Sequence, residues 1–392
     1  MLHWFLRSLG RFARLAVWSL WPPAGCGARR SWRRVLVMVP FLMLLALVQA
    51  VHWLGFLLDE LFFRGYRRVQ VRAPLFVLGV PRSGTTYLHG VLADDPQFTT
   101  FSTWECLFAL SVSARRFWLL VGTLDRRVGR PLGRLAALVE RHALGGLDDV
   151  HPVRLDSPEE DYFCLVPIFA CFILMVPFPY AGWIRRMAYF DRDLDAAEQR
   201  RVLDYYETCL KKHLYVHGEH LTLLSKNAAF ASLAAGLAER FPEARFICCL
   251  RDPVRTVPSQ LSSLRSGIDL FDNDPASPRF TDEFVEMLGW DYVHLHDVLA
   301  SLPSHRAQFV DMSRLREDLA GFVPEAYARL GLDLQPQFRE SLARHAAAGQ
   351  EFRSAHRYAT ADFGLTDEDL GTRLADAYAS YRQALDRNGA AS

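Results

Sequence analysis

The 392-residue chain lacks the residue patterns of a glycosylated, disulfide-bonded or metal-binding protein. None of its three asparagines, Asn227, Asn273 and Asn388, is followed two positions later by Ser or Thr, so the chain has no N-glycosylation acceptor. Its cysteines form an odd, scattered set without metal-ligand spacing, and we expect them to be reduced thiols in the core. They are Cys26, Cys106, Cys164, Cys171, Cys209, Cys248 and Cys249. These absences favour a cytosolic environment over a secretory lumen, and they predict no metal site.

Lysine is scarce, and the charges are unevenly distributed. Three of the 45 basic residues are Lys and the other 42 are Arg. The net charge is +1, yet residues 1–72 hold 11 Arg against Asp59 and Glu60, so this segment carries +9 and the rest of the chain −8. The imbalance predicts that the N-terminal segment meets an anionic surface such as lipid headgroups. It argues against a globally basic nucleic-acid-binding protein.

The first 21 residues have the pattern of an amphipathic helix that lies in a membrane interface. Arg7, Arg11 and Arg14 fall on one helical face, and Leu, Phe and Trp fill most of the rest. We therefore expect this segment to lie on a membrane surface.

A second apolar stretch, residues 35–58, has no charged residue and is long enough to cross a bilayer. Pro40, Gln49 and His52 weaken it as a spanning helix, and a re-entrant or monotopic anchor is also open. Arg residues flank both of its ends, so the charge rule does not give the orientation. The alternative is a pair of helices packed on a soluble domain. We expect residues 1–72 to form a membrane-associated segment, with the remainder of the chain facing the cytoplasm.

From residue 73 onward the pattern predicts an α/β domain. An apolar run at 75–80 ends in a Gly/Pro turn and is followed by a helical stretch at 85–93. Apolar runs at 221–225 and 244–250 are separated by a helical segment, which predicts a right-handed parallel crossover. We expect a three-layer α/β fold with a central parallel sheet and with ligands at the carboxyl ends of the strands. Further helices are expected at 104–121, 131–143, 158–174, 195–216, 282–300, 315–330 and 367–386.

The turn after the first predicted strand has the spacing of a phosphate-binding loop. Gly79 and Gly84 are separated by four residues, and such loops hold phosphate oxygens with backbone N–H groups at a helix N-terminus. Thr85 stands where a nucleotide P-loop has Lys, whereas Arg82 inside the loop can donate two hydrogen bonds to an anion. The loop suits a nucleotide with one 5′-phosphate and a different leaving group. The alternative is a strand-to-helix turn without a ligand.

A second candidate phosphate site follows the strand at 244–250. Arg251 stands at the strand end and Ser259 lies eight positions later, so a guanidinium and a hydroxyl can bind one phosphate monoester. Taken alone, the Arg-Asp-Pro sequence that begins at Arg251 is also typical of a capped helix start.

With these two motifs in this order, residues 73–382 resemble the P-loop sulfotransferases, and within them the branch of protein-tyrosine sulfotransferases and related bacterial enzymes, whose loop reads Pro-Arg-Ser-Gly-Thr-Thr. The resemblance implies a P-loop-type sulfotransferase domain over 73–392, which moves a sulfuryl group from 3′-phosphoadenosine 5′-phosphosulfate (PAPS) to an acceptor hydroxyl. It implies that the 3′-phosphate meets Arg251 and Ser259. It implies that the 5′-phosphosulfate is held by Arg82, Ser83, Gly84, Thr85 and Thr86.

Two residues are candidates for the chemistry. Lys226 stands at the carboxyl end of a predicted strand in an Arg-rich chain, where its compact charge suits stabilisation of the leaving phosphate oxygen. The resembling family also has a Lys at this point. The alternative is a solvated Lys near a helix start. The family places a catalytic Glu at a distance from the loop similar to that of Glu105, although Ser102 and Glu105 also match a capping box. Glu159, in an acidic cluster at 156–161, is the reserve candidate for the base.

The acceptor and two other functions stay open. The aromatic-rich segment 163–183 and the N-terminal segment favour a lipid or another amphipathic alcohol. The segment 352–358 resembles the part of the family that folds over the cofactor, where Arg357 is a candidate phosphate ligand. A P-loop kinase or NTPase is disfavoured by Thr85. A non-catalytic membrane protein that retains the fold is the other alternative.

Overall fold

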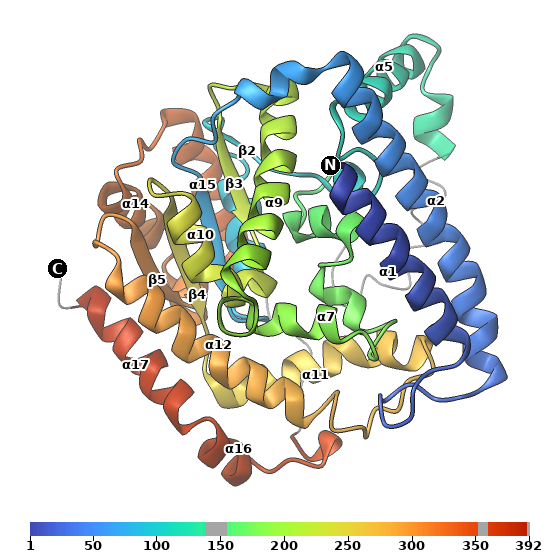
Figure 1. The fold of residues 1–392 in the computed structure, drawn as a ribbon. Coiled ribbons are helices and arrows are strands. Elements are labelled where there is room, and N and C mark those ends of the chain that lie inside the picture. The colour runs from blue at the N-terminus through green and yellow to red at the C-terminus, as the bar shows by residue number, and fades with distance from the viewer. Residues whose placement is uncertain (136, 138–154, 352–359, 390–392) are drawn as a thin grey trace.

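The computed structural model describes residues 1–135, 137, 155–351 and 360–389 (Figure 1). Its centre is a parallel sheet of five strands in the order β2-β3-β1-β4-β5. The strands are β1 (Leu75–Gly79), β2 (Phe98–Thr99), β3 (Thr222–Lys226), β4 (Arg245–Leu250) and β5 (Ala307–Asp311). The predicted α/β class with a central parallel sheet is therefore confirmed. The sequence prediction found β1, β3 and β4 but missed the two edge strands.

Helices cover both faces of this sheet. The α-helices are α1 (Leu2–Leu20), α2 (Trp32–Phe62), α3 (Thr85–Leu92), α4 (Thr103–Phe108), α5 (Val112–Arg127), α7 (Gly182–Arg185), α8 (Phe190–Asp193), α9 (Ala196–His217), α10 (Ala234–Arg240), α11 (Pro253–Leu270), α12 (Asp282–Ser301), α13 (Met312–Glu317), α14 (Leu319–Leu330), α15 (Pro336–Glu351), α16 (Asp367–Arg373) and α17 (Ala375–Gly389). The 3-10 helices are η1 (Arg64–Arg68), η2 (Asp161–Ile168), η3 (Phe172–Met175), η4 (Arg186–Tyr189), η5 (Ala228–Leu233) and η6 (Thr360–Phe363).

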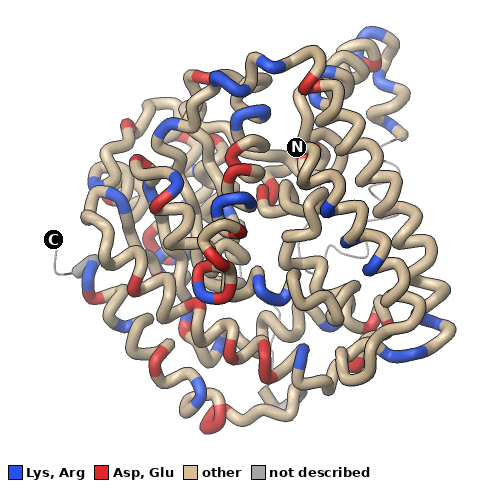
Figure 2. Tube along the Cα trace, in the orientation of Figure 1, with Lys and Arg blue, Asp and Glu red and all other residues tan. Residues whose placement is uncertain are grey.

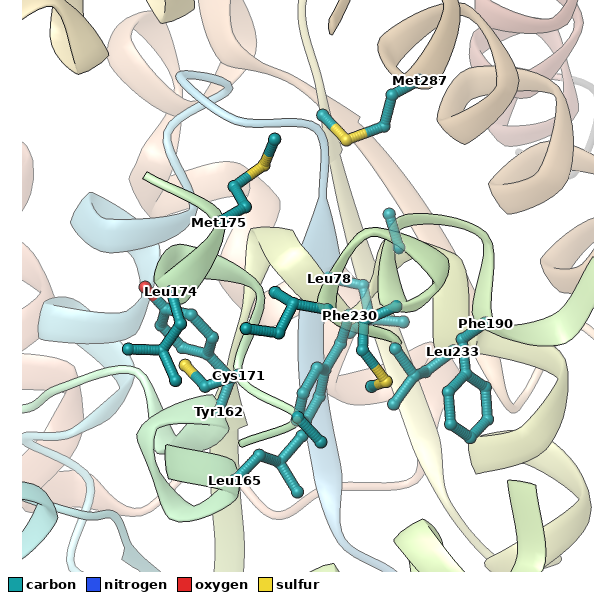
Figure 3. Close-up of a cluster of buried hydrophobic side chains, with 14 of the residues drawn as sticks. Leu78, Tyr162, Leu165, Cys171, Leu174, Met175, Phe190, Phe230, Leu233 and Met287 are labelled. Carbon is teal, nitrogen blue, oxygen red and sulfur yellow. The ribbon is translucent and has the colours of Figure 1, made fainter. Parts of the chain in front are cut away.

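Alternate residues of β1 face two separate hydrophobic clusters, as expected for a strand buried on both faces. Leu75 and Val77 join a cluster with side chains of α3, α14 and α15. Phe76 and Leu78 join a larger cluster on the opposite face. Figure 3 shows Leu78 in this second cluster, close to Phe230 of η5. The central strand thus holds the phosphate loop on a rigid base.

Several helices expected from the sequence are interrupted, and the one expected at 315–330 is divided at Asp318 between α13 and α14. The segment 158–174 forms η2 and η3, because Pro167 lies in it and Phe169 has a left-handed backbone with φ of 50°. The segment 104–121 is split between α4 and α5, where Ser111 caps α5 by accepting a hydrogen bond from the N–H of Ala114. The segment 367–386 is likewise split between α16 and α17. Most of the helix expected at 131–143 lies outside the described residues.

The N-terminal helices α1 and α2 pack on the rest of the chain along one edge of the molecule (Figure 1). Trp4 and Leu15 of α1 and Met38 and Leu42 of α2 belong to the same hydrophobic cluster as Phe76 of β1. Within the described residues, α2 is the helix that is long and apolar enough to cross a membrane by length and composition. The boundary at residue 72 stays a prediction, since the hydrophobic cluster continues across it.

Candidate active site

Three residues of the turn between β1 and α3 have positive φ angles, a backbone conformation that favours glycine. Gly79 has φ of 153°, and a Cβ there would lie 2.1 Å from the carbonyl oxygen of Cys249 on β4. Gly84 is left-handed, with φ of 92°, and caps α3. Arg82 is also left-handed, at φ of 65°, which is strained for a residue with a side chain. When left-handed residues such as Arg82 and Gly84 alternate with residues of negative φ, successive N–H groups point toward one side. Such a backbone can bind an anion.

The second motif lies beside this loop. The Nε of Arg82 donates to the Oγ of Ser259 over 3.3 Å, and Nη1 of Arg251 donates to the carbonyl oxygen of Arg82 over 3.3 Å. Asp252 caps α11 by accepting from the N–H of Arg255, which orients the helix that carries Ser259. The structure therefore brings together Arg82, Arg251 and Ser259, which are far apart in the sequence.

The charges around Arg251 fit a phosphate ligand. Burial lowers the pKa of Arg251, and the neighbouring guanidinium groups of Arg316 and Arg82 lower it further. Within the part of the chain that the structure describes, none of these three arginines forms an ion pair with a carboxylate. Unpaired positive charges at a strand end stabilise a bound anion. Sequence reasoning missed Arg316, which lies on α13 beyond the unrecognised strand β5.

Lys226 connects the phosphate loop with the acidic cluster. It is the last residue of β3 and pairs in register with Val77 of β1, so its side chain lies beside the loop. Its Nζ donates to the Oγ1 of Thr86 over 3.1 Å and forms an ion pair with Oε1 of Glu160 at 2.6 Å. Sequence reasoning placed Glu160 in the acidic cluster but did not single it out. Its partner lies 66 positions away, so no local signal marks it.

A buried network positions this ion pair. Asp161 accepts hydrogen bonds from Tyr206, Ser225 and Asn227, and the last two flank Lys226. Burial raises the pKa of Asp161 to about 6, although these hydrogen bonds oppose the shift. Because the network fixes Asp161 to β3, it also fixes the neighbouring Glu160 in front of the Lys226 ammonium group.

Glu105 is enclosed by partners of its own. Its Oε2 accepts from the N–H and Oγ of Ser102 at 3.0 and 2.9 Å, which is the predicted capping box. Its Oε1 accepts from Nε of Arg115 at 2.9 Å and contacts Nε2 of His217 at 2.7 Å. Burial alone would raise the pKa of Glu105, but Arg115, His213 and His217 outweigh it and hold the pKa well below its usual range. A general base needs a free oxygen and a pKa nearer to neutral. These surroundings favour a structural role.

The same carboxylate belongs to the one group among the described residues that could hold a metal ion. Ligand atoms of Glu105, His213 and His217 lie within 4.8 Å of one another. The buried Arg115 guanidinium already supplies a positive charge to Glu105. A divalent cation would add to that charge in a buried site, so we assign the group to an ion-pair network.

The remaining candidates have structural contacts or lie outside the described residues. Glu159 accepts from Oγ1 of Thr103 at 3.1 Å with one oxygen and from the N–H of Glu160 at 2.9 Å with the other. Arg357 lies outside the described residues. The candidate site therefore centres on the loop, Arg251, Ser259, Lys226 and Glu160.

Comparisons with known proteins identify the family to which the chain belongs. Residues 74–336 match the sequence profile described as the Sulfotransferase family. The omega-hydroxy-beta-dihydromenaquinone-9 sulfotransferase Stf3 of Mycobacterium bovis is 26% identical over 371 residues, which cover 87% of each chain. The protein of the same name from Mycobacterium tuberculosis matches equally.

Two solved structures share the fold. The sulfotransferase STF1 of Mycobacterium tuberculosis superposes with a TM-score of 0.70 at 18% identity, covering 94% of this chain and 92% of that one. The sulfotransferase STF9 of Mycobacterium avium superposes with a TM-score of 0.68 at 18% identity, covering 95% and 94%. Since the family profile matches well over half of its residues, the chain belongs to the sulfotransferase family.

Proposed function

We propose that this sulfotransferase moves a sulfuryl group from PAPS to the hydroxyl of a membrane lipid, with Lys226 and Glu160 at the reacting atoms. Family membership implies PAPS as the donor. When bound, PAPS supplies an activated sulfuryl group and leaves as adenosine 3′,5′-bisphosphate. The observation that carries the proposal is the position of Lys226, whose Nζ contacts both Thr86 of the phosphate loop and Glu160.

In this proposal the two phosphate motifs hold opposite ends of the donor. Residues 82–86 bind the 5′-phosphosulfate with their backbone N–H groups and the threonine hydroxyls, at the N-terminus of α3, since the hydroxyl of Ser83 already donates to the carbonyl oxygen of Val80. Arg251 and Ser259 bind the 3′-phosphate. The contact of Arg82 with Ser259 supports a single ligand, because it joins the two motifs into one surface.

Arg251→Ala is expected to weaken the binding of adenosine 3′,5′-bisphosphate about 10- to 100-fold, because a hydrogen bond to a charged group contributes roughly 1.5–3 kcal/mol. Isothermal titration calorimetry measures this change. Arg265→Ala is the matched control, because Arg265 lies on the same helix but pairs with Asp269. Binding of ATP in preference to the bisphosphate would contradict the donor assignment.

Lys226 has the geometry to stabilise the charge that develops on the leaving phosphate oxygen. Its ammonium group is nearly buried, where a charge acts more strongly than in water. The carboxylate of Glu160 holds it in place before substrates bind. The compact ammonium group suits a position next to a threonine hydroxyl at the loop.

Lys226→Met is expected to lower kcat roughly 100-fold or more, since the removal of one donor that stabilises transition-state charge lowers kcat by about that factor. The binding of adenosine 3′,5′-bisphosphate should change much less. Lys211→Met is the control, because Lys211 lies on α9 and pairs with Glu207. Equal losses in both variants, with melting curves unchanged, would exclude a special role of Lys226.

Glu160 is the carboxylate best placed to accept the proton of the acceptor hydroxyl. It is the carboxylate that contacts Lys226, and its side chain is 22% exposed. Both oxygens of Glu105 and of Glu159 already accept hydrogen bonds within the protein. We therefore propose Glu160 as the base in place of Glu105 and Glu159.

A lipid alcohol is the acceptor class that the surroundings of Glu160 support. η2 follows Glu160 directly and carries buried apolar side chains such as Tyr162 and Leu165 (Figure 3). The relative Stf3 is named for a hydroxylated dihydromenaquinone. The apolar helix α2 supports attachment to a membrane. All seven cysteines are free and buried, which supports a catalytic domain in the reducing cytoplasm.

Transfer of radioactive sulfate from labelled PAPS tests the acceptor class. The full chain is incubated either with a membrane lipid extract or with tyrosine-containing peptides. Label in a lipid product supports the proposal. Label in the peptides alone would show that the acceptor is a tyrosine hydroxyl and not a lipid, in line with the similarity of the loop to protein-tyrosine sulfotransferases.

A further inference from the structure

The helix α2 turns its polar side chains toward the protein and its apolar side chains outward. Its buried positions recur every three or four residues from Arg34 to Asp59 and include Gln49 and His52. The exposed positions between them are mostly Leu, Val and Met. A surface helix in water shows the opposite arrangement. The outward side of α2 therefore suits an apolar solvent.

Polar contacts hold α2 to the catalytic domain along its whole length. Near its start, Arg34 donates to the carbonyl oxygens of Phe271 and Pro177 at 2.6 and 2.9 Å. In the middle, Nε2 of Gln49 donates to the carbonyl oxygen of Val166 at 3.0 Å. Near its end, Asp59 forms a fully buried ion pair with Lys212 at 2.8 Å. Arg34 and Asp59 are thus both fixed to the domain.

These contacts are incompatible with a helix that crosses a bilayer. The 31 residues of α2 extend roughly 46 Å. The domain that α2 contacts from end to end carries the charged phosphate site and many surface ion pairs. If α2 crossed the bilayer, that domain would have to enter the hydrocarbon layer with it, at several kcal/mol per unsatisfied polar group, in order of magnitude.

The exposed apolar surface of α2 continues onto neighbouring helices. Of the 29 exposed large apolar side chains found among the described residues, 28 belong to residues 2–135, and Leu270 is the exception. They come mainly from α1, α2 and α5, which lie together along one edge of the molecule (Figure 1). An apolar concentration of this size marks an interaction surface. We call it the apolar face.

The composition of the rim indicates a lipid bilayer as the partner. Trp21 and Trp32 are exposed at the ends of α1 and α2, where interfacial tryptophans are favoured in membranes. Arginines gather at both ends of α2, whereas its middle is free of charge (Figure 2). Anionic headgroups complement such a rim. In a symmetric pair of chains the same rim would face its own positive charge.

We infer that the chain is a monotopic membrane protein, in which α2 lies in the plane of one leaflet and the apolar face of α1, α2 and α5 enters that leaflet without crossing it. This inference rests on the membrane attachment in the proposed function and specifies its geometry. η2, which begins after Glu160, accepts hydrogen bonds from Gln49 of α2 and from Arg11 of α1. The proposed base therefore lies next to the elements that enter the leaflet, where a lipid hydroxyl can reach it.

Cysteine labelling tests the topology. Ala24→Cys lies in the exposed turn between α1 and α2, and Ser301→Cys lies at the exposed end of α12. The native cysteines are buried, so they give little background in the folded chain. In inverted membrane vesicles and in spheroplasts, a membrane-impermeant maleimide should label both variants from the same side. Labelling from opposite sides would show that α2 spans the bilayer and would overturn the inference.

Liposome flotation tests whether the apolar face binds the membrane. It uses α5, because α5 would not contact the bilayer if α2 alone were a spanning helix. Leu120→Glu with Leu124→Glu places two charges on α5, at positions 58% and 50% exposed, so the variant should fold. Its partition coefficient onto anionic vesicles should fall about tenfold or more. The control, Ala379→Glu with Gln383→Glu, adds the same charges to exposed positions of α17 and should bind like the wild type.

Other results separate failure of the inference from failure of the proposed function. Unchanged flotation of the α5 variant would exclude α5 from the face. A wild-type dimer that the α5 variant converts into a monomer would assign the face to a second copy of this chain. Absence of the wild type from vesicles, with transfer to lipid alcohols retained in detergent, would refute attachment but not the sulfotransferase reaction.

Discussion

Glu160→Gln is expected to lower kcat by about 10²–10⁴, because general-base catalysis contributes a factor of this order. The amide keeps the shape of the side chain and can still accept a hydrogen bond from Lys226, but it cannot take the proton of the acceptor hydroxyl. Binding of adenosine 3′,5′-bisphosphate should remain close to that of the wild type. Steady-state transfer from labelled PAPS gives kcat, and calorimetric titration gives the binding constant.

Glu159→Gln is the matched control for this prediction. Glu159 is the adjacent residue, but its oxygens accept from Thr103 and from the backbone N–H of Glu160. In Glu159→Gln the amide oxygen can accept from the N–H of Glu160 while the amide NH2 donates to the hydroxyl of Thr103, so this variant should keep most of its turnover. Full activity of Glu160→Gln together with loss of activity in Glu159→Gln would transfer the role of base to the earlier candidate.

The candidate residues of the phosphate loop and the second motif could be placed from the sequence, whereas Glu160 and Arg316 could not. The phosphate loop, Arg251 and Ser259 are short motifs next to apolar strands, and parallel strands place their carboxyl ends at one edge of the sheet. Glu160 and Arg316 depend on contacts with distant parts of the chain. The contact of Glu160 with Lys226 spans 66 positions, and Arg316 follows a strand that the sequence pattern did not reveal.

The fold shows the same division between local and distant signals. The central strands β1, β3 and β4 were predicted from continuous apolar runs, since both of their faces are buried. The edge strand β2 has two residues, too few for any periodicity. The capping box at Ser102 was predicted from spacing and is present. The partners that surround Glu105, among them Arg115 and His217, could not be read from the same pattern.

The N-terminal segment carried a signal that length and mean hydropathy do not use. Gln49 and His52 interrupt the apolar stretch at 35–58 and count against a spanning helix. In the structure both lie on the buried side of α2 together with Arg34 and Asp59. A helical projection of the polar positions therefore distinguishes a helix docked on its own domain from one surrounded by lipid.

Glu105→Gln is expected to lower the free energy of unfolding by about 3–5 kcal/mol, as measured for one partner lost from a buried ion pair. Glu105 is 2% exposed, and the side chain of Arg115 is fully buried, so the variant leaves a guanidinium without a compensating charge. Chemical denaturation at pH 7 measures the loss. Turnover at a temperature where the variant is still folded should fall much less than in Glu160→Gln.

The pH dependence of this loss follows from the lowered pKa of Glu105. A carboxylate whose pKa is lower in the folded than in the unfolded chain stabilises the fold at pH values above its unfolded-state pKa. This contribution is lost as the pH falls toward the folded-state pKa. The difference in stability between wild type and Glu105→Gln should therefore shrink below pH ~4.5. A second variant, Glu105→Gln with Arg115→Met, should recover part of the stability, because it removes the unpaired charge. Wild-type stability of Glu105→Gln combined with loss of turnover would instead support the catalytic role first predicted for Glu105.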